Sequence, residues 1–420
     1  MTTANIHRTI ETVWKIEAAR LIAGLARMLR DVGQAEDLAQ EALVVALERW
    51  PQDGVPDNPG AWLMTTAKRR AIDLIRHHKM RDDKQAALAY EFETEAMTHA
   101  PDHADALDDD IGDDLLRLIF TACHPVLNRD MQVALTLRML GGLTTSEIAR
   151  AFLVPDATVA QRIVRAKRTL AEKQVPFEVP RGEELAPRLA SVLEVVYLIF
   201  NEGYTATTGD DWARPALCEE AMRLGRVLAG LAPREPEVHG LVALMEIQAS
   251  RLHARVAADG APILLLDQDR SRWDRLLISR GLTGLERAEQ LGGADANYAL
   301  QAAIAACHAR ALHAEDTDWV RIASLYARLA EVAPSPVVEL NRAVAVSMAE
   351  GPEAGLYLVD ALQKERALAS YHLLPSVRGD LLFKLGRRDE ARAEFERAAA
   401  LTNNARESAL LRRRAGACAD

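Results

Sequence analysis

Apolar residues recur every three to four positions along most of this 420-residue chain, and this spacing constrains the fold more than any other feature. The stretch IETVWKIEAARLIAGLARML shows it, and so does GQAEDLAQEALVVALERW, where one face is formed by Leu38, Ala42, Val45 and Leu47. Ala, Leu, Arg and Glu dominate the composition, and β-branched or aromatic runs are scarce. The sequence therefore predicts an all-α protein, and its length predicts two or three domains.

Charge, cysteine content and hydropathy argue against a polycationic protein, a disulfide-linked protein and a membrane-spanning protein. The formal net charge is −10, so any surface for nucleic acid must be local. The four cysteines lie far apart without a CxxC pair, which indicates buried or incidental thiols in a reducing compartment; they are Cys123, Cys218, Cys307 and Cys418. The first residues lack the apolar segment of a signal peptide, and runs such as Ile263–Leu266 are too short to span a bilayer. We expect a cytoplasmic protein without a cofactor or a metal ion.

The stretch AWLMTTAKRRAIDLIRHHK, residues 61–79, predicts a helix with an apolar face and a basic face. The apolar face holds Leu63, Ala67, Ala71 and Leu74, helped by Met64 and Ile75. The opposite face holds Trp62, Thr65, Arg69, Asp73 and Arg76, with Lys68 beside it. Basic side chains neutralise phosphates, and an exposed aromatic ring stacks on an unpaired base. The alternative is a solvated face whose Trp62 packs on the preceding turn, Pro51–Gly60.

The composition then becomes acidic. Residues 91–114 contain ten Asp or Glu and no Lys or Arg. Such a run buries too little apolar surface to order itself, so we expect a linker over residues 86–114, with helices resuming at Leu115. A solvated loop is the plain interpretation of this run. Mimicry of nucleic-acid charge, or a place in a basic channel, is the alternative.

Residues Gly141–Lys173 have the layout of a helix-turn-helix. Thr144 and Glu147 fit a capping box, the first helix runs to about Phe152, and Pro155 with Asp156 mark the turn and the next N-cap. The second helix carries one acid, Glu172, and five bases: Arg162, Arg165, Lys167, Arg168 and Lys173. Thr158, Gln161, Arg162 and Arg165 share a face suited to base edges, whereas Lys167 and Arg168 suit phosphates.

Residues 181–420 follow the proline-bounded segment VPFEVP and are rich in Ala, Leu and Arg. Two stretches near the end, EGPEAGLYLVDAL and KLGRRDEARAEFERAAAL, carry two alanines on either side of a large apolar residue at matching positions: Ala354, Leu358 and Ala361 in the first, and Ala391, Phe395 and Ala398 in the second. A more degenerate copy contains Ile322, Tyr326 and Pro334. Spacings of 32 and 37 residues between the copies are close to the 34 of a tetratricopeptide unit, although other helical hairpins imitate the pattern.

Together these segments resemble the extracytoplasmic-function group of bacterial sigma factors. Residues 8–81 are similar to sigma region 2, and we expect this domain to cover residues 1–85. Residues 115–173 are similar to the region 4 helix-turn-helix, and we expect that domain to cover residues 115–175. No region 1.1 or region 3 is recognised around or between them. NEGYTATTGDDW and LLLDQDRSRWD, at residues 201–212 and 264–274, resemble the subgroup with a long C-terminal tetratricopeptide-like extension. The resemblance implies a protein that directs promoter-specific initiation by core RNA polymerase and is not an enzyme.

The resemblance also implies residue roles. Asp37, Gln40 and Glu41 would contact the β′ clamp of the polymerase, and region 4 would lie near its β flap. The −10 element would face Trp62, Lys68, Arg69, Asp73 and Arg76. The −35 element would face Thr144, Thr158, Gln161, Arg162, Arg165 and Arg168. The extension would regulate, or contact polymerase or a protein partner, through a polar cluster formed by Asp267, Asp269, Arg270, Arg272 and Trp273.

A purely structural role remains an alternative for several of these residues. In the polar cluster, Asp267 and Asp269 are expected to pair with Arg270 or Arg272 and fix a helix start. The rivals to the whole assignment are an adaptor of tetratricopeptide type, or a helix-turn-helix regulator that does not act through core polymerase. An enzyme is the remaining rival, but the only adjacent histidine pair is His77–His78, and no phosphate-binding loop or nucleophile motif is present.

Overall fold

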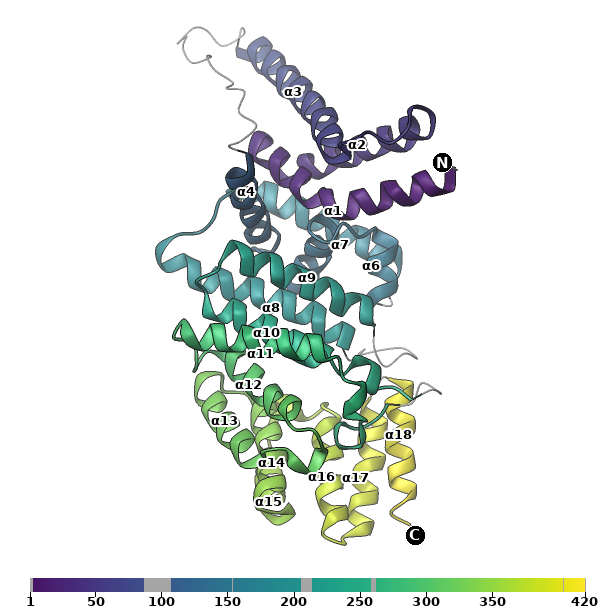
Figure 1. Cartoon of the computed structure of the whole chain (residues 1–420), viewed down its shortest axis with the longest axis vertical. Coiled ribbons are helices and arrows are strands. Elements are labelled where there is room, and N and C mark those ends of the chain that lie inside the picture. The colour runs from purple at the N-terminus through teal and green to yellow at the C-terminus, as the bar shows by residue number, and fades with distance from the viewer. Residues whose placement is uncertain are drawn as a thin grey trace. The chain divides into compact units, whose positions relative to one another are not determined.

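A computed structural model describes residues 3–86, 107–152, 154–204, 214–257, 262–402 and 404–419. These residues form helices joined by short connections and contain no strand beyond one isolated bridge, Val256 to Pro262, which confirms the all-α prediction. The chain divides into two compact units, Met1–Val195 and Val196–Asp420. The division falls within one helix, α8, and not at the proline-bounded segment before it (Figure 1).

The described residues of the first unit form seven helices and the start of an eighth. They are α1 (Thr3–Leu29), α2 (Val32–Asp53), α3 (Pro59–Ala86), α4 (Leu107–Ala122), α5 (Arg129–Met139), α6 (Thr145–Phe152), α7 (Asp156–Glu172) and α8 (Leu185–Tyr204), with a 3-10 turn η1 (Gly182–Glu184) before α8. Helix α1 is the centre of this unit because it packs on α2, α3 and α4. Its stripe of Ile10, Trp14, Leu21 and Leu25 is buried, as the helical period predicts.

Local signals fix where α1, α2 and α3 end and begin. Arg30 takes a left-handed φ of 55°, and Asp31 caps α2 by accepting hydrogen bonds from the backbone N–H of Gly33 and Gln34 at 2.8 and 3.0 Å. At the other end, α2 continues through Pro51 to Asp53 and is closed by Gly54 at φ 89°. The expected turn over residues 51–60 is therefore shorter, since three of its residues belong to α2 and two to α3.

Two other expectations about boundaries were wrong. Helix α4 begins at Leu107 and not at Leu115, so the last eight residues of the expected linker are helical. Acidic side chains are favourable at a helix N-terminus, which explains how so acidic a stretch starts a helix. The rest of the acidic run lies outside the described residues. Helix α7 is capped by Pro155 without a side-chain hydrogen bond, and Asp156 is its first residue, so Asp156 is not the N-cap.

In the second unit, the residues that the structure describes form the remainder of α8 and ten further helices. They are α9 (Pro215–Leu231), α10 (Pro236–Ala249), α11 (Arg275–Gln290), α12 (Asn297–Arg310), α13 (Trp319–Val332), α14 (Pro336–Glu350), α15 (Pro352–Leu362), α16 (Leu373–Lys384), α17 (Arg388–Leu401) and α18 (Ala405–Gly416). Short 3-10 turns lie between some of them: η2 (Leu252–Ala254), η3 (Leu265–Asp267), η4 (Arg270–Arg272), η5 (Ala314–Asp316) and η6 (Arg366–Leu368).

Successive helices from α12 to α18 pack on one another, and Figure 1 shows α16, α17 and α18 side by side. Small residues permit the close approaches. A side chain at Gly355 in α15 would overlap Ser347 in α14, and one at Gly379 in α16 would lie 3.0 Å from the ring of Phe395 in α17. Phe395 and Ala398, which the repeat pattern predicts to face the neighbouring helix, are buried. Helical hairpins are therefore present, while their assignment as tetratricopeptide units remains a prediction.

Candidate polymerase and promoter interfaces

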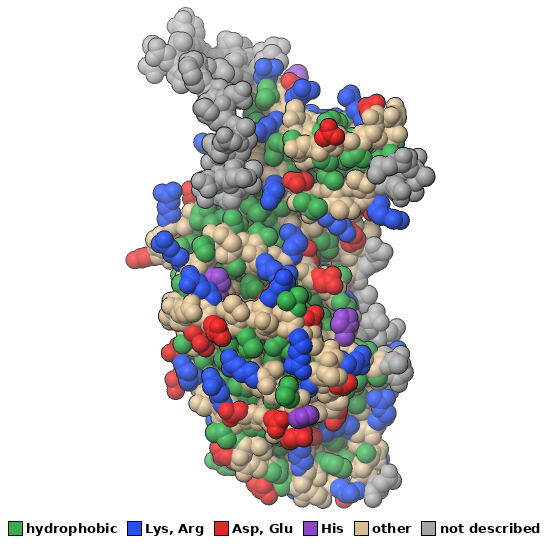
Figure 2. Space-filling model, viewed as in Figure 1, with side chains coloured by type: hydrophobic (Ala, Val, Ile, Leu, Met, Phe, Trp, Pro, Cys, Tyr) green, Lys and Arg blue, Asp and Glu red, His purple; other side chains and the backbone are tan. Residues whose placement is uncertain are grey.

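Basic residues are distributed over many of the described helices. On the face drawn in Figure 2, Lys and Arg side chains are interspersed with Asp and Glu. Among the described residues, no group of three His, Cys, Asp or Glu is arranged to hold a metal ion. None of the described helices is long and apolar enough to cross a membrane. The two helices singled out by the sequence, α3 and α7, are therefore considered separately.

Helix α3 presents a basic face, but its tryptophan does not stand free on it. Trp62 is half-buried, and its ring meets that of Trp50, at the end of α2, edge to face with 5.4 Å between centroids. The alternative in which Trp62 packs against the preceding segment is therefore the better description. Arg69, Asp73 and Arg76 are exposed; the last two lie 3.9 Å apart. The prediction of an outward-facing basic surface thus holds for the arginines alone.

The apolar face of α3 is narrower than its sequence predicts. Leu63, Ala67 and Ala71 are buried, whereas Ile75 is 41% exposed and does not belong to the core. Arg70, at the border of this face, forms an ion pair with Glu41 of α2. Lys68 is half-buried. Helix α3 is thus attached to α2 through its first half.

The helix-turn-helix forms as predicted. Thr144 donates its backbone N–H (2.8 Å) and its hydroxyl (2.9 Å) to Glu147, and its hydroxyl accepts the backbone N–H of Glu147 at 3.1 Å, which completes the capping box. Burial acts to raise the pKa of Glu147, but the bonds from Thr144 and the charge of Lys15, 3.4 Å away, lower it. The first helix of the motif, α6, thereby starts at a defined residue.

On α7, the predicted base-reading face is partly occupied by contacts within the chain. Gln161 and Arg165 are exposed. Arg162 is half-buried and donates to Asp130 of α5 at 2.6 Å, and Arg168 pairs with Glu172 at 2.6 Å. Val164, which the sequence analysis did not single out, is 63% exposed beside Arg165. An apolar side chain on this face suits contact with a thymine methyl group.

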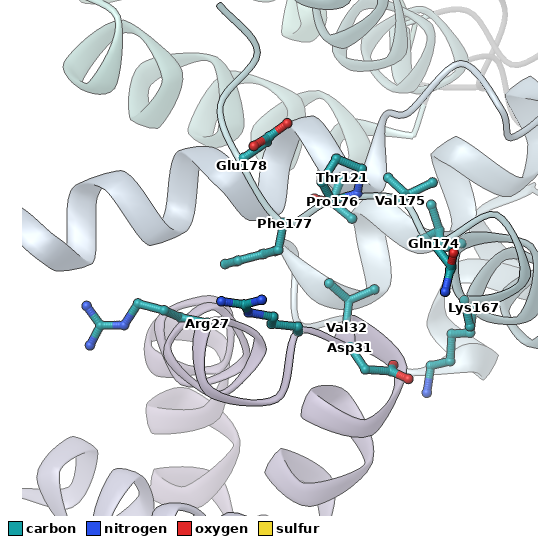
Figure 3. A pocket seen from close by; sticks show the side chains of 13 residues that line it. Arg27, Asp31, Val32, Thr121, Lys167, Gln174, Val175, Pro176, Phe177 and Glu178 are labelled. Carbon is teal, nitrogen blue, oxygen red and sulfur yellow. The ribbon is translucent and has the colours of Figure 1, made fainter. Parts of the chain in front are cut away.

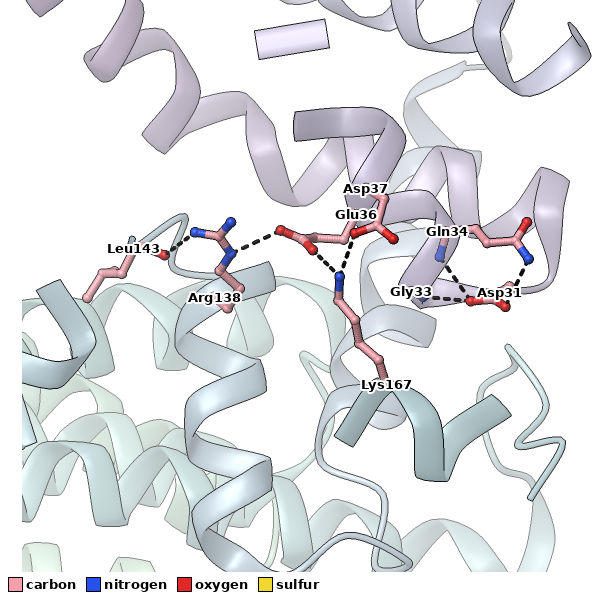
Figure 4. A network of polar contacts seen from close by, with 8 residues as sticks. All are labelled: Asp31, Gly33, Gln34, Glu36, Asp37, Arg138, Leu143 and Lys167. Carbon is pink, nitrogen blue, oxygen red and sulfur yellow. Dashed lines mark hydrogen bonds and ion pairs between the residues drawn. The ribbon is translucent and has the colours of Figure 1, made fainter. Parts of the chain in front are cut away.

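Lys167 has a different environment from the one predicted. Its ammonium group forms ion pairs with Glu36 and, at 2.9 Å, with Asp37, both on α2 (Figure 4). Glu36 is buried and also accepts from Arg138 Nε of α5 at 2.9 Å. Burial acts to lower the pKa of Lys167, but the two carboxylates raise it. Lys167 is therefore engaged within the protein and does not face solvent as a phosphate contact would require.

Glu36 and Arg138 are functional candidates that the sequence analysis missed. The signal for Glu36 was present in the helical period, because it lies four residues after Val32 and three before Ala39, which are both buried. A carboxylate on that stripe needs a cationic partner to be buried. Its partners come from α5 and α7, more than one hundred residues further along the chain, so no local pattern identified them.

A cavity of about 780 Å³ lies beside this network. It is lined by the end of α1, the start of α2, the end of α7 and the segment that follows α7, including Phe177 and Glu178. Figure 3 shows Arg27 and Lys167 at opposite ends of this lining. Arg27 is also 3.3 Å from the buried Asp114 of α4. Ion pairs thus join α2 to α7 and α1 to α4 beside a polar cavity.

The polar cluster of the second unit agrees with the expectation at Asp269, which fixes a helix start, and departs from it at Arg270. Asp269 accepts from the backbone N–H (2.9 Å) and hydroxyl (2.6 Å) of Ser271 and so caps η4. Arg270 pairs with neither aspartate: it is 4% exposed and donates to the carbonyls of His308 and Ala311, both at 2.9 Å. Trp273 is also buried. Only Asp267, Asp269 and Arg272 lie on the surface.

Three segments of the chain match protein families. Residues 16–81 match Sigma-70 region 2, residues 117–170 match Sigma-70, region 4, and residues 188–289 match a family of unknown function, DUF6596. The last match begins in α8 and ends in α11, so it contains the polar cluster.

The chain is also similar to several curated proteins. An uncharacterized protein of Rhizobium meliloti is 44% identical over 396 residues, which cover 93% of this chain and 91% of that protein. The probable ECF RNA polymerase sigma factor SigI of Mycobacterium tuberculosis is 28% identical over 175 residues, 41% of this chain and 58% of SigI. The ECF RNA polymerase sigma factor SigK of Mycobacterium ulcerans is 29% identical over 155 residues, 36% of this chain and 78% of SigK.

A region 2 helical domain followed by a region 4 helix-turn-helix defines the class of sigma-70-type factors. Within that class, the chain belongs to the extracytoplasmic-function RNA polymerase sigma factors and carries a long C-terminal helical extension. Proteins of this family bind core RNA polymerase and promoter DNA and direct the initiation of transcription, and the family is not a class of enzymes.

Proposed function

We propose that α3 binds the −10 element through Lys68, Arg69, Asp73 and Arg76, with Trp62 at its first turn. The support is the exposure of Arg69, Asp73 and Arg76 on a helix whose opposite face is buried. Trp62, held edge to face on Trp50, keeps part of its ring accessible for stacking on an unpaired base. Base capture offsets the few kcal/mol that unstacking of each base step costs.

We propose that α7 reads the −35 element, with Gln161 and Arg165 contacting bases and Thr144, Thr158, Arg162 and Arg168 positioning the helix. Gln161 and Arg165 are both exposed on one face. Arginine pairs in a bidentate manner with guanine and glutamine with adenine, each worth about 1–3 kcal/mol of discrimination. Arg162 is bound to Asp130 in the free chain, so its contact with DNA requires exchange of that partner.

We propose that Asp37, Gln40 and Glu41 form the contact with the β′ clamp and that region 4 lies near the β flap. Asp37 and Glu41 are exposed, and each already holds a cation of this chain, Lys167 and Arg70 respectively. Docking on polymerase therefore exchanges Lys167 for a basic group of the partner. That exchange removes the exposed part of the contact between α7 and α2, while the buried Glu36 still holds Lys167 until polymerase positions the two helices as linked sites.

Run-off transcription with purified core polymerase tests the assignment of α7. The Arg165→Ala variant should lose its preference for one −35 base pair by about 5- to 150-fold, as the loss of about 1–3 kcal/mol predicts. Lys173→Ala, at the end of the same helix, is the matched control and should leave sequence preference unchanged. A wild-type chain that gives no promoter-specific transcript would favour the adaptor or the polymerase-independent regulator instead.

We propose that the extension regulates initiation or contacts the polymerase or a protein partner. Truncation tests this role, and the structure indicates where to cut. Ser191 in α8 is buried and donates to the Cys123 carbonyl at 3.1 Å, so removal of residues from 181 would damage the first unit. Truncation after Val195 keeps this contact. Equal transcription levels and equal control in the truncated and full-length proteins would exclude a regulatory role.

A further inference from the structure

The second unit contains a cluster of basic and aromatic side chains that the proposed function does not use. The guanidinium carbon of Arg251, just before η2, lies 5.7 Å from the ring centroid of Trp273 and 5.8 Å from that of Tyr204. The guanidinium carbon of Arg270, in η4, lies 5.1 Å from the same Trp273 centroid. Two cations therefore share one indole, and His308 of α12 is next to them, since its carbonyl accepts from Arg270.

The hydrogen bonds of this cluster are incomplete. Arg270 uses its two terminal nitrogens on the carbonyls of His308 and Ala311 and on the hydroxyl of Thr317, at 2.9 Å each, yet its Nε is buried without an acceptor. Arg251 Nε and Trp273 Nε1 are also buried and lack acceptors among the described residues. Buried N–H groups are almost always paired in native proteins, so three orphaned donors around one ring mark a site that lacks its acceptor.

The charges of the cluster are only partly compensated. Neither Arg251 nor Arg270 forms an ion pair with a carboxylate in the part of the chain that the structure describes. Burial, followed by the charge of Arg251, lowers the pKa of Arg270, while the charges of Asp316 and Glu315 act to raise it. Burial, followed by both guanidiniums, lowers the pKa of His308 to about 3, which leaves that ring neutral at physiological pH. Buried charges in proteins are normally paired, and an anion is the partner that is missing.

We propose that Arg251, Arg270 and Trp273 form a binding site for a small oxyanion, a carboxylate or phosphate group that accepts the three orphaned N–H donors. Guanidinium groups match the geometry of both kinds of oxyanion, and the indole N–H adds a donor that carries no charge. Each of the three donor atoms is buried, which favours a small molecule over a large partner. Arg251 is half-buried, so the cluster meets solvent on its side.

The test is titration calorimetry of the full-length chain with inorganic phosphate and, separately, with succinate, at constant ionic strength. We expect one of the two anions to bind. Arg251→Gln should weaken that binding at least tenfold and leave the fold intact, because no hydrogen bond of the Arg251 side chain stabilises the described structure. Arg272→Gln is the control, an exposed arginine in the same 3-10 turn as Arg270, and should bind as the wild type does.

Trp273→Phe separates a binding role from a packing role. It keeps an aromatic ring and removes only the orphaned donor, so the variant should unfold at the same or a higher temperature and yet bind the anion several-fold more weakly. Binding of neither anion overturns the proposal. Equal affinity in the wild type, Arg251→Gln and Trp273→Phe also overturns it, because the binding would then be at an adventitious surface site.

Discussion

Neutralising Glu36 should open the contact between regions 2 and 4. The Glu36→Gln variant leaves Arg138 and Lys167 facing each other without the carboxylate that both now share. Breaking a buried ion pair by removing one partner typically costs about 3–5 kcal/mol. Here the two cations keep 18% and 17% exposure of their side chains, and Lys167 retains Asp37. The expected cost of the Glu36→Gln substitution is therefore lower, about 2–3 kcal/mol. This corresponds to a roughly 30- to 150-fold shift toward an open form, in which α2 no longer contacts α5 and α7.

Native-state hydrogen exchange of the full-length chain measures this shift. Amides in the first turns of α2 and in the second half of α7 should lose protection by the factor given above, while those of α13 to α18 keep theirs. Asp37→Asn is the matched control, because Asp37 is 70% exposed and an exposed ion pair is worth at most about 1 kcal/mol. Equal exchange in Glu36→Gln and Asp37→Asn would refute the reasoning that burial makes Glu36 the residue that holds the contact.

Three other measurements test individual features. Burial is the main cause that lowers the pKa of His308 to about 3 in the folded chain, whereas the same group has a pKa near 6.5 in the unfolded chain. The free energy of unfolding of the second unit should therefore fall as the pH is lowered from 6.5 toward 3. Urea denaturation measures this fall, which should be smaller in the His308→Asn variant. Burial raises the pKa of the Cys218 thiol to about 12, so this thiol should resist a disulfide reagent at pH 8 until urea is added. Gly355→Ala should lower the free energy of unfolding by about 1–3 kcal/mol, because the added methyl group would overlap Ser347 of α14. Gly230→Ala is the control, since space is open around Gly230, and it should leave the stability unchanged or raise it. Thermal unfolding of both variants measures the difference.

Local patterns predicted much of this molecule. The helical period identified the buried stripe of α1, and the spacing of Thr144 and Glu147 predicted a capping box that is present atom by atom. Both are decided within a few residues of the chain, where backbone geometry and side-chain reach leave few alternatives. Resemblance of the same segments to sigma regions 2 and 4 was confirmed by the family matches.

The errors share a physical cause. Lys167 was assigned to phosphate because a lysine on a helix-turn-helix is basic and usually exposed, but its partners Glu36 and Asp37 lie 131 and 130 residues away in the sequence. Trp62 was placed on an open face, and Trp50 covers part of it. The pattern of a single helix states which residues share a face, but not which other helix packs there.

The sequence alone determined that this chain is helical, where its helix-turn-helix begins, and that it belongs with sigma factors. Only the tertiary structure decided which charged groups are free to meet DNA or polymerase. A lysine and an arginine are alike in a helical pattern whether they face water or a buried carboxylate. The difference arises because the desolvation cost of a charge depends on every element packed around it, and that packing is a property of the whole fold.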